Sequence, residues 1–406
     1  MANASIKIPL VFSTDRNYVF PTVVTISSAL KNAHDGTFYD IYIQTTDDCV
    51  LLCNSLVDFL KKKYSNFKVS YLLMNPDEFV NSSNTSGHVT MPTFYRLKLA
   101  EQLLLCNRCI VLDSDIIIRD DLSSIFNYDM KDNYIAGVKS WDAQQPTAAN
   151  ERRRVIDGLP DMNQYILLGV LLMDLDKIRN DNMTDMFLSH MTKGYPHDDQ
   201  DVFNVCCYDK ITFLPQKFNF VCKYCESGFP HGKLVCSQKE LQDALKFPVI
   251  VHFPGIIDKP WNNRYSVPYS DEWWQCASLF INTKEYKDFS LRHLILEEKY
   301  QFARLLNYSV QKENVVVCGF TVLGKMITAF LLKNSVDVFC IMDNDLNKRN
   351  LTFMGLPVKT LESLLKGVKK TLNFSFIITN QKHGHEIENL LKVAGIDKDN
   401  IYMLYE

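Results

Sequence analysis

Short apolar segments alternate with amphipathic segments from the start of the chain, and this alternation constrains the fold more than any other feature. Residues 8–13, 38–45 and 68–74 are short and rich in apolar and β-branched side chains, which is typical of strands. Residues 21–31 and 50–63 lie between them and have the apolar spacing of helices. A β-α-β-α-β order predicts an α/β fold with a mostly parallel sheet covered by helices.

The alternation continues beyond these elements, with one interruption. Residues 93–105 are expected to form a helix, and residues 109–112 a buried strand. The polar stretch 141–164 breaks the pattern and carries three consecutive arginines, Arg152 to Arg154, which indicate a solvent-exposed surface excursion or, alternatively, an acceptor or phosphate contact.

A second domain follows. The 406 residues suggest two or three domains. We expect one domain over residues 1–288, a bridging helix or linker over 289–313, and a second α/β domain over 314–406, where strand-like and helix-like runs alternate again.

The overall charge disfavours a nucleic-acid partner. The formal net charge is −3, so there is no general basic field to hold a phosphate backbone. No segment is long and apolar enough to be expected to cross a bilayer, and residues 8–12 resemble a first strand more than a secretion signal. We therefore expect a cytoplasmic protein, and association with the inner face of the membrane stays open.

Two carboxylates follow a buried strand at Asp113 and Asp115. At the carboxyl end of a parallel strand, such side chains point into the crevice where α/β proteins bind ligands. Two hard oxygen ligands suit Mn²⁺ or Mg²⁺, which in turn can hold a diphosphate. The alternative is a strand-end turn with solvated aspartates.

A second candidate segment begins at the end of another apolar run, with His252. Its imidazole could complete the metal site of Asp113 and Asp115, although a lone histidine is more often structural. Gly255 would let the backbone approach a phosphate, and Lys259 would supply positive charge for it.

Five segments of the chain match, in order, motifs of one known family. They are Phe12-Ser13-Thr14-Asp15-Arg16-Asn17-Tyr18, Thr93-Phe94-Tyr95-Arg96-Leu97, Leu112-Asp113-Ser114-Asp115, Asp199-Gln200-Asp201 with Leu214-Pro215 and Phe218-Asn219, and His252 to Trp261. Through these segments the chain resembles the retaining glycosyltransferases of family eight over roughly residues 6–279. That family includes glycogenin and bacterial lipooligosaccharide and lipopolysaccharide galactosyl- and glucosyltransferases. The resemblance implies a GT-A-type α/β domain that binds a UDP-sugar and a divalent metal.

The resemblance implies roles for individual residues in donor binding. Asp15 and Asn17 would contact the uridine, and Tyr18 would stack on its base. Arg96 and Ser114 would contact the donor, together with Gly255 and Lys259 of the closing segment. Asp113, Asp115 and His252 would hold the metal.

The same resemblance places Gln200 at the reacting face of the sugar and Asp199 where it would orient sugar hydroxyls. An amide is a poor nucleophile, so this implies a front-face substitution in which the leaving phosphate helps to deprotonate the acceptor. Lys259 would stabilise the charge on that phosphate. The expected donor is UDP-glucose or UDP-galactose, and the acceptor a glycan, a glycoprotein or a lipid-linked sugar.

Two departures keep other functions open. Leu167-Leu168-Gly169 stands where the family has an asparagine two residues before the glycine, and the spacing from Gly255 to Lys259 is one residue longer than the family's commonest spacing. A non-catalytic nucleotide-sugar-binding or scaffold protein is one alternative. An aspartyl phosphatase is another, because Asp113-x-Asp115 after an apolar strand also fits its nucleophile motif.

The tail has a glycine-containing turn, Gly319 to Gly324, between an expected strand and helix, and Asp343 closes the next strand. It resembles the small Rossmann-like domain of many sugar-nucleotide and polysaccharide biosynthesis proteins. Thr321 occupies the middle glycine position of the dinucleotide fingerprint, where a side chain would crowd a pyrophosphate. We therefore expect a structural role or docking of a protein partner rather than cofactor binding.

Overall fold

The computed structural model describes residues 6–80, 82, 91–223, 235–255, 259–262, 267–290, 302–349, 351–366, 374–380 and 382–404. The chain divides into two compact units. The first holds most of the chain up to Tyr286, and the second holds the described residues from Lys287 onward together with Lys223 and the described residues of Ile256–Asp271.

The first unit begins with the predicted β-α-β-α-β arrangement, which is formed by β1 (Ile6–Ser13), α1 (Val19–Lys31), β2 (Thr37–Thr45), α2 (Asp47–Lys61) and β3 (Phe67–Leu73). The three strands are parallel neighbours. β1 and α1 are almost wholly buried, whereas β3 lies at the sheet edge and is only partly buried.

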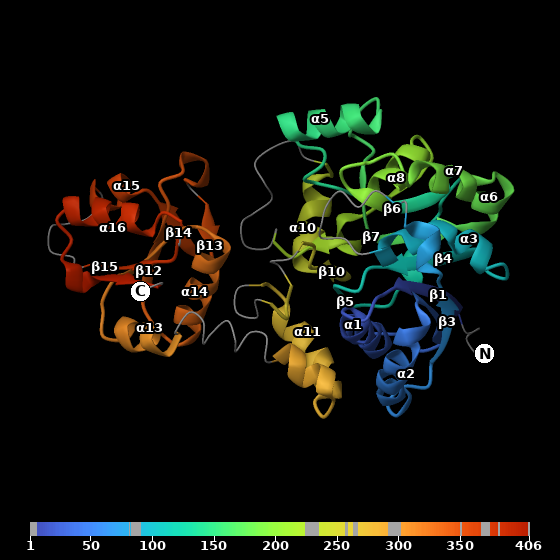
Figure 1. Ribbon diagram of the computed structural model, residues 1–406, viewed down its shortest axis with the longest axis horizontal. Helices are drawn as coiled ribbons and strands as arrows, with labels where there is room; N and C mark the ends of the chain where they lie inside the picture. The colour runs from blue at the N-terminus through green and yellow to red at the C-terminus, as the bar shows by residue number, and fades with distance from the viewer. Residues whose placement is uncertain are drawn as a thin grey trace. The chain divides into compact units, whose positions relative to one another are not determined.

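Four further strands complete a seven-stranded sheet, namely β4 (Arg108–Leu112), β6 (Ile135–Lys139), β7 (Ile166–Asp174) and β8 (Ile211–Leu214). The strand order is β3-β2-β1-β4-β7-β6-β8. β7 runs antiparallel to both neighbours, so the sheet is mostly parallel with one reversed strand (Figure 1). The mostly parallel sheet predicted from the alternation is confirmed.

A second, three-stranded sheet lies in the same unit and consists of β5 (Ile116–Ile118), β9 (Phe220–Val221) and β10 (Ile250–His252). β10 is its central strand, antiparallel to β5 and parallel to β9. Because β5 begins directly after Asp115, this small sheet brings the end of β10 beside the end of β4.

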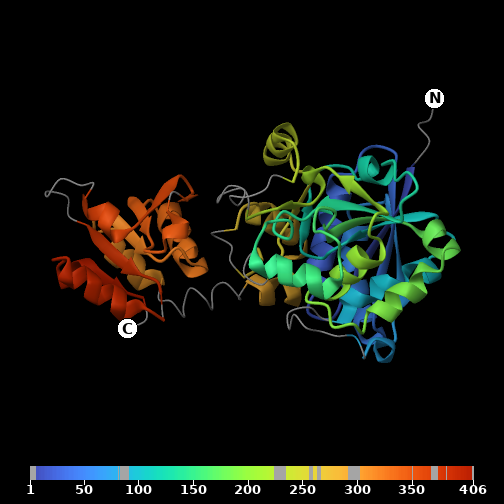
Figure 2. The same cartoon turned by 90° about the horizontal axis from the view of Figure 1, so that it is seen from above.

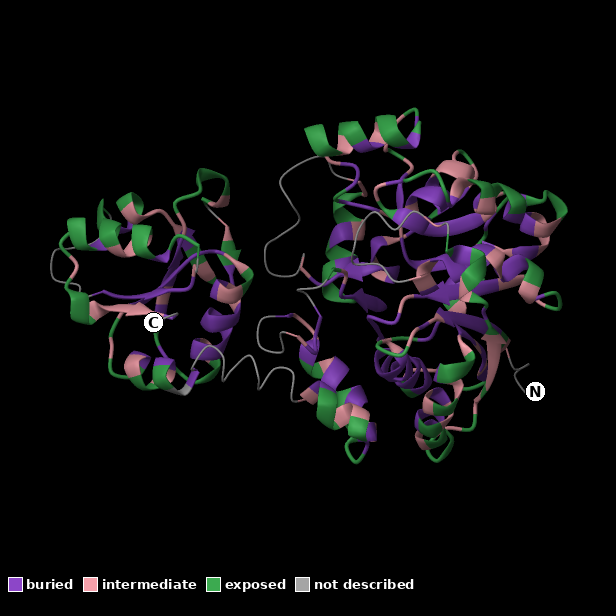
Figure 3. Ribbon diagram, viewed as in Figure 1, coloured by how far each residue is buried: buried purple, intermediate pink, exposed green. Residues whose placement is uncertain are grey.

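Apolar side chains pack on both faces of the large sheet. On one face, Val11 and Leu171 belong to a buried cluster with Phe187 and Phe203, whose ring centroids are 4.8 Å apart. Figure 3 shows buried strands and helices with one exposed side, and Figure 2 shows the helices from above.

The other α-helices of the unit are α3 (Leu99–Gln102), α4 (Ser123–Phe126), α5 (Ala148–Asp157), α6 (Leu175–Asn180), α7 (Met183–His190), α8 (Asp198–Cys206) and α10 (Gln238–Lys246). Its 3₁₀ helices are η1 (Pro76–Phe79), η2 (Met91–Lys98), η3 (Gln216–Phe218) and η4 (Ser278–Phe280). The helix α11 (Ser270–Ala277) begins in the second unit.

The helix expected over residues 93–105 is different in the structure. The segment is mostly the 3₁₀ helix η2, followed by the single short turn α3. The side chain of Arg96 donates from Nε to the carbonyl of Thr93, and the hydroxyl of Thr93 bonds to Asp199. Two side-chain contacts, one of them to α8, accompany the 3₁₀ form of this segment.

The second unit contains a six-stranded sheet of order β13-β14-β12-β11-β15-β16. All of its pairs are parallel except β13–β14. This is the small Rossmann-like domain that the sequence predicts. Its elements are α13 (Phe302–Ser309), β11 (Val315–Cys318), α14 (Val322–Lys333), β12 (Val338–Met342), η5 (Leu346–Lys348), β13 (Thr352–Phe353), β14 (Leu356–Lys359), α15 (Leu361–Lys366), β15 (Ser375–Ile378), α16 (Gly384–Val393), η6 (Lys398–Asn400) and β16 (Ile401–Met403).

Of the range 289–313 expected to form a bridging helix or linker, residues 291–301 lie outside the described residues, and α13 occupies part of the remainder. The proposed division at 289–313 stays a proposal. Among the described residues, no helix combines the length and the apolar character needed to span a bilayer.

Candidate active site

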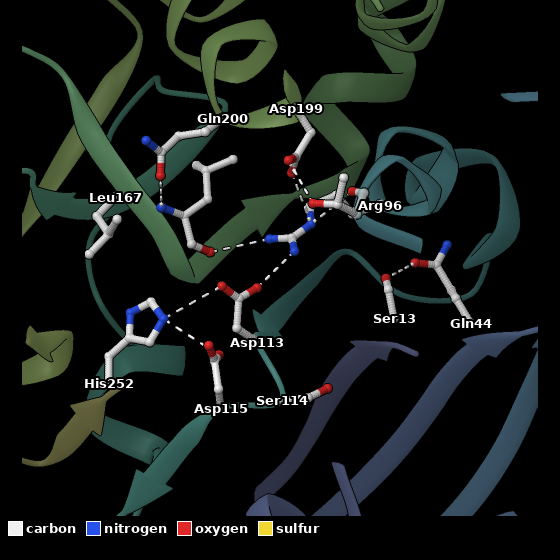
Figure 4. Close-up of polar contacts among 12 residues, drawn as sticks. Ser13, Gln44, Arg96, Asp113, Ser114, Asp115, Leu167, Asp199, Gln200 and His252 are labelled. Carbon is white, nitrogen blue, oxygen red and sulfur yellow. Dashed lines mark hydrogen bonds and ion pairs between the residues drawn. The ribbon is translucent and has the colours of Figure 1, made fainter. Parts of the chain in front are cut away.

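The two aspartates of the predicted metal motif occupy the turn between β4 and β5. Antiparallel pairing of β5 with β10 sets His252 opposite Ile116, the residue after Asp115. His252 Nε2 lies 3.5 Å from Asp115 Oδ1 and 3.8 Å from Asp113 Oδ2 (Figure 4). Ligand atoms of the three side chains lie within 4.8 Å of one another. The structure therefore brings together the three residues expected to hold a metal.

Two threonine hydroxyl groups of α1 make hydrogen bonds to this turn, one to its backbone and one to a side chain. The Thr25 hydroxyl donates to the carbonyls of Ser114 and Ile116, at 3.0 and 2.9 Å. The Thr22 and Ser114 hydroxyls are 2.8 Å apart, so the Ser114 side chain bonds toward α1. Sequence reasoning missed Thr22 and Thr25, because their spacing also fits a helix that is simply buried.

Arg96 links both sides of the site. Its guanidinium donates to Asp113 Oδ1 at 2.7 Å and to the carbonyl of Leu168 at 3.3 Å, and Nε lies 3.3 Å from Asp199 Oδ2. Burial lowers the pKa of Arg96, but the Asp113 and Asp199 carboxylates outweigh it and raise that pKa above its usual value. Arg96 is thus a buried cation shared by two carboxylates.

Asp199 and Gln200 lie in the first turn of α8, but neither acts as a helix cap. Asp199 accepts a hydrogen bond from the Thr93 hydroxyl at 2.6 Å. Burial raises the pKa of Asp199 to about 6, against the opposing effect of Arg96. Gln200 Oε1 accepts a 3.3 Å hydrogen bond from the Leu168 N–H.

A bulge in β7 makes these backbone contacts available. Pairing between β6 and β7 jumps from Gly137–Leu171 to Val138–Leu167, so residues 168–170 have no partner on β6. The N–H of Leu168 then reaches Gln200, and its carbonyl reaches Arg96. Bulges commonly redirect a strand beside an active site.

Gln200 also makes a hydrogen bond to a cluster of buried polar side chains. Gln200 Nε2 donates to the Tyr165 hydroxyl at 3.1 Å, and that hydroxyl bonds to Asp201. Arg153 of α5 pairs with Asp201 and lies over the Tyr165 ring, 4.2 Å from its centroid. The prediction of a wholly solvated arginine face was therefore wrong for Arg153, which is buried because its partners lie beneath α5.

The turn between β1 and α1 holds the residues expected to bind the uridine. The Asp15 carboxylate accepts hydrogen bonds from the backbone N–H groups of Asn17 and Tyr18, at 2.9 and 3.2 Å. Asn17 is exposed and Tyr18 partly buried. Asp15 therefore shapes the turn that presents Asn17 and Tyr18, and their contacts with uridine stay predictions.

The closing segment is described only in part. Gly255 has φ +77°, a left-handed conformation that favours glycine. Lys259 belongs to the second compact unit, where its ammonium lies 5.8 Å from the centroid of the Trp261 ring. Residues 256–258 lie outside the described residues, and the roles of Gly255 and Lys259 toward a donor stay predictions.

The charges of the site fit a divalent cation. Asp113, Asp115 and Asp199 bring three carboxyl groups close to one buried guanidinium, that of Arg96. Two carboxylates and an imidazole are a ligand set that Mn²⁺ or Mg²⁺ accepts. The other ring nitrogen of His252, Nδ1, is hydrogen-bonded to Asn219, whose Oδ1 lies 2.9 Å away.

Solved structures show the same architecture. The galactosyltransferase LgtC, in complex with donor and acceptor sugar analogues, matches with a TM-score of 0.60 and 21% identity over 70% of this chain and 100% of that chain. The bifunctional glycosyltransferase WbbM matches with a TM-score of 0.60 and 21% identity, over 72% of this chain and 52% of that one. The first unit accordingly has a GT-A-type fold.

Sequence comparison identifies the family. The lipopolysaccharide 1,2-glucosyltransferase of Escherichia coli K12 is 26% identical over 318 residues, or 75% of this chain and 87% of that protein. A putative glycosyltransferase of Haemophilus influenzae is 24% identical over 262 residues, or 63% of this chain and 74% of that protein. The model of glycosyl transferase family 8 matches residues 9–264, more than half of the chain. The chain therefore belongs to glycosyl transferase family 8.

Proposed function

We propose that this glycosyltransferase is a retaining hexosyltransferase that moves glucose or galactose from a UDP-sugar to a glycan, glycoprotein or lipid-linked acceptor of the cell surface. The observation that carries the proposal is the cluster of Asp113, Asp115 and His252 at the ends of β4 and β10. Related glucosyl- and galactosyltransferases of lipopolysaccharide support the choice of sugars.

Different residues of the site are proposed to have different roles in donor binding. A divalent cation held by Asp113, Asp115 and His252 would stabilise the charge that develops on the leaving diphosphate. Arg96 holds Asp113 in place for this role and lies within reach of Asp199. Lys259 and the backbone at Gly255 are proposed to contact the phosphates from the closing segment.

Transfer is proposed to proceed on one face of the sugar. The bond between the anomeric carbon and the diphosphate oxygen breaks, and the acceptor oxygen attacks from the same side. The acceptor proton passes to the leaving phosphate oxygen. Gln200 would face the anomeric carbon, where its amide can stabilise positive charge without acting as a strong nucleophile, and Asp199 would orient sugar hydroxyls.

The nucleotide base is proposed to lie on the β1–α1 turn. Tyr18 would stack on a flat pyrimidine, and Asp15 and Asn17 would read its edge. UDP should then bind more tightly than ADP or GDP. Equal affinities in calorimetry would argue against this assignment.

One assay tests the proposal directly. UDP release from UDP-glucose and from UDP-galactose is measured with Mn²⁺, with Mg²⁺ and after chelation. We expect metal-dependent release from at least one of the two donors. Release that is unchanged by chelation would overturn the metal-assisted mechanism.

A non-catalytic nucleotide-sugar-binding or scaffold protein is the second candidate, favoured by one observation. Leu167 of β7 supplies no side-chain amide at the edge of the site. Donor binding in calorimetry without any UDP release would support this reading. Two observations count against an aspartyl phosphatase. The chain belongs to a glycosyltransferase family. In addition, the Asp113 carboxylate forms an ion pair with Arg96, which does not favour its use as a nucleophile.

A further inference from the structure

His252 makes a different contact through each ring nitrogen. Nε2 faces Asp113 and Asp115 at 3.8 and 3.5 Å, whereas Nδ1 lies 2.9 Å from Oδ1 of Asn219. The ring is 3% exposed and the Asn219 residue 1% exposed. The tautomer of this imidazole is therefore set by its protein neighbours rather than by bulk water.

The orientation of the Asn219 amide is fixed from its other side. Its Nδ2 donates to the carbonyl of Leu167 at 3.2 Å. A carbonyl can only accept, so the amide nitrogen must face Leu167 and the amide oxygen must face His252. An amide oxygen also only accepts, and Nδ1 of His252 must therefore carry a proton.

The position of the ring is fixed as well. A Cβ added at Gly169 would lie 2.3 Å from Cε1 of His252 and 2.5 Å from its Nδ1. The imidazole is thus packed against the bare backbone of the β7 bulge, with Asn219 at its Nδ1 edge. Asn219 itself is held between η3 and β9, the strand that pairs with β10.

We infer that Asn219 is a positioning residue that keeps the proton of His252 on Nδ1, so that Nε2 offers its lone pair to the cation at Asp113 and Asp115. The inference rests on the proposed metal-assisted function, but the tautomer can be measured without any metal. Partners of this kind orient metal-binding histidines, and their loss typically weakens metal affinity about 10- to 100-fold. Asn219 touches the histidine and the backbone of β7, and acts on the cation through His252.

Asn204 provides a matched control. It is also an asparagine with 1% exposure, and its side chain also bonds to the β7 backbone, at Ile166. None of its hydrogen bonds in the described part of the chain reaches His252. Asn219→Leu and Asn204→Leu thus remove comparable buried amides, and only the first removes the partner of Nδ1.

Two measurements on the full-length protein test the inference. Mn²⁺ affinity is measured by electron paramagnetic resonance with UDP present, and we expect Asn219→Leu to weaken it about 10- to 100-fold while Asn204→Leu stays within about twofold. Long-range ¹H–¹⁵N NMR of histidine-labelled, metal-free protein, assigned with His252→Gln, should show a protonated Nδ1 and an unprotonated Nε2 in mildly alkaline buffer. Asn219→Leu should lose this pattern, and Asn219→Asp, which keeps an acceptor, should retain it.

The outcomes separate this inference from the proposed function. A wild-type protein whose His252 carries its proton on Nε2 alone would overturn the inference, and this reading needs no variant to fold. Equal weakening of Mn²⁺ binding by both leucine variants would also overturn it, because a general packing loss would then explain the effect. A third outcome is that the wild type binds no Mn²⁺, yet its Nδ1 proton is seen and is lost in Asn219→Leu. The metal proposal then fails, and the assignment of Asn219 as the residue that sets the tautomer stands.

Discussion

At the scale of single residues, the two aspartates of the metal cluster differ in their surroundings. One oxygen of the Asp113 carboxylate lies 2.7 Å from the guanidinium of Arg96, and the other faces His252 in the proposed metal site. Asp115 faces His252 and is not among the ion-pair partners described for Arg96. Removing Asp113 takes an ion-pair partner from the buried guanidinium of Arg96, whereas removing Asp115 takes away only a smaller electrostatic contribution to it.

This difference predicts separable effects of two substitutions. Asp115→Ala should lower metal-dependent UDP release by roughly 10²-fold or more, because it removes a proposed ligand of the charge-stabilising cation. Asp113→Ala should lower it similarly and should also destabilise the fold by about 3 kcal/mol, the usual cost of leaving a buried charge with a lost partner. UDP-release assays and denaturant unfolding of both variants would measure the two effects. Equal stability of both variants would contradict the role given to Arg96.

The sequence predicted Asp113, Asp115 and His252 as a cluster, and the structure confirms that they lie together. Strand-end carboxylates and a strand-end imidazole are visible in the local pattern. The residues that form hydrogen bonds to the turn carrying the two aspartates were not predictable from the local pattern. The contacts of Thr22 and Thr25 with the turn join residues about 90 positions apart, and only the tertiary pairing of α1 with β5 brings them together.

At the scale of elements, the bulge of β7 lies against the ring of His252, and this contact explains the glycine at position 169. Gly169 has no side chain because His252 occupies the space a Cβ would need, and its carbonyl accepts from the N–H of Asp113 at 3.0 Å. The bulge therefore joins the metal turn, the histidine and Gln200 through backbone groups. No periodicity in the sequence marks a bulge.

Gly169→Ala should displace His252, since a contact of 2.3 Å with its ring cannot be relieved without moving the imidazole or the strand. We expect a loss of about 1–3 kcal/mol in stability from overpacking, together with weaker Mn²⁺ binding. Gly384→Ala in α16 is the control, because its nearest neighbour lies at 3.4 Å. Thermal unfolding and Mn²⁺ titration compare the two, and unchanged Mn²⁺ affinity in Gly169→Ala would show that the ring has room to move.

The helix α5 carries a pH-dependent contact. Burial and the charge of Asp201 raise the pKa of Asp157 to about 7, whereas the pKa of an aspartate in an unfolded chain is about 3.9. Between these values the folded chain binds a proton that the unfolded chain does not, so this group's contribution to stability falls as pH rises from about 4 to about 7 and then levels off.

Asp157→Asn should therefore remove this part of the pH dependence. The gain in melting temperature relative to the wild type should be larger near pH 8 than near pH 5, because the neutral amide imitates the protonated acid. Glu151→Gln on the exposed side of the same helix should not reproduce that difference in this range. A gain that is equal at both pH values would mean that Asp157 is ionised throughout.

At the scale of the whole molecule, the order of strands and helices was largely predictable in both units, because alternation along the chain reflects burial in each sheet. The burial of Arg153 was not, since it depends on an ion pair with the distant Asp201, and the 3₁₀ character of η2 was not predicted either. The second unit raises a separate question, because its fold is one that often binds dinucleotides.

The final prediction concerns that unit, which we expect to bind no dinucleotide. Asp343, where a ribose partner would be expected, accepts from the Phe320 N–H at 2.8 Å and pairs with Lys348 at 2.9 Å. Thr321 Oγ1 accepts from the N–H of Gly324 at 3.1 Å, so its side chain caps α14 where a pyrophosphate would approach. In saturation-transfer NMR of the full-length protein, UDP should give a signal and NAD none. Thr321→Gly alone should not create NAD binding, because Asp343 keeps its hydrogen bonds from the Phe320 and Asp345 N–H groups and its ion pair with Lys348. An NAD signal that disappears in Asp343→Ala would show that these contacts open to admit a ligand.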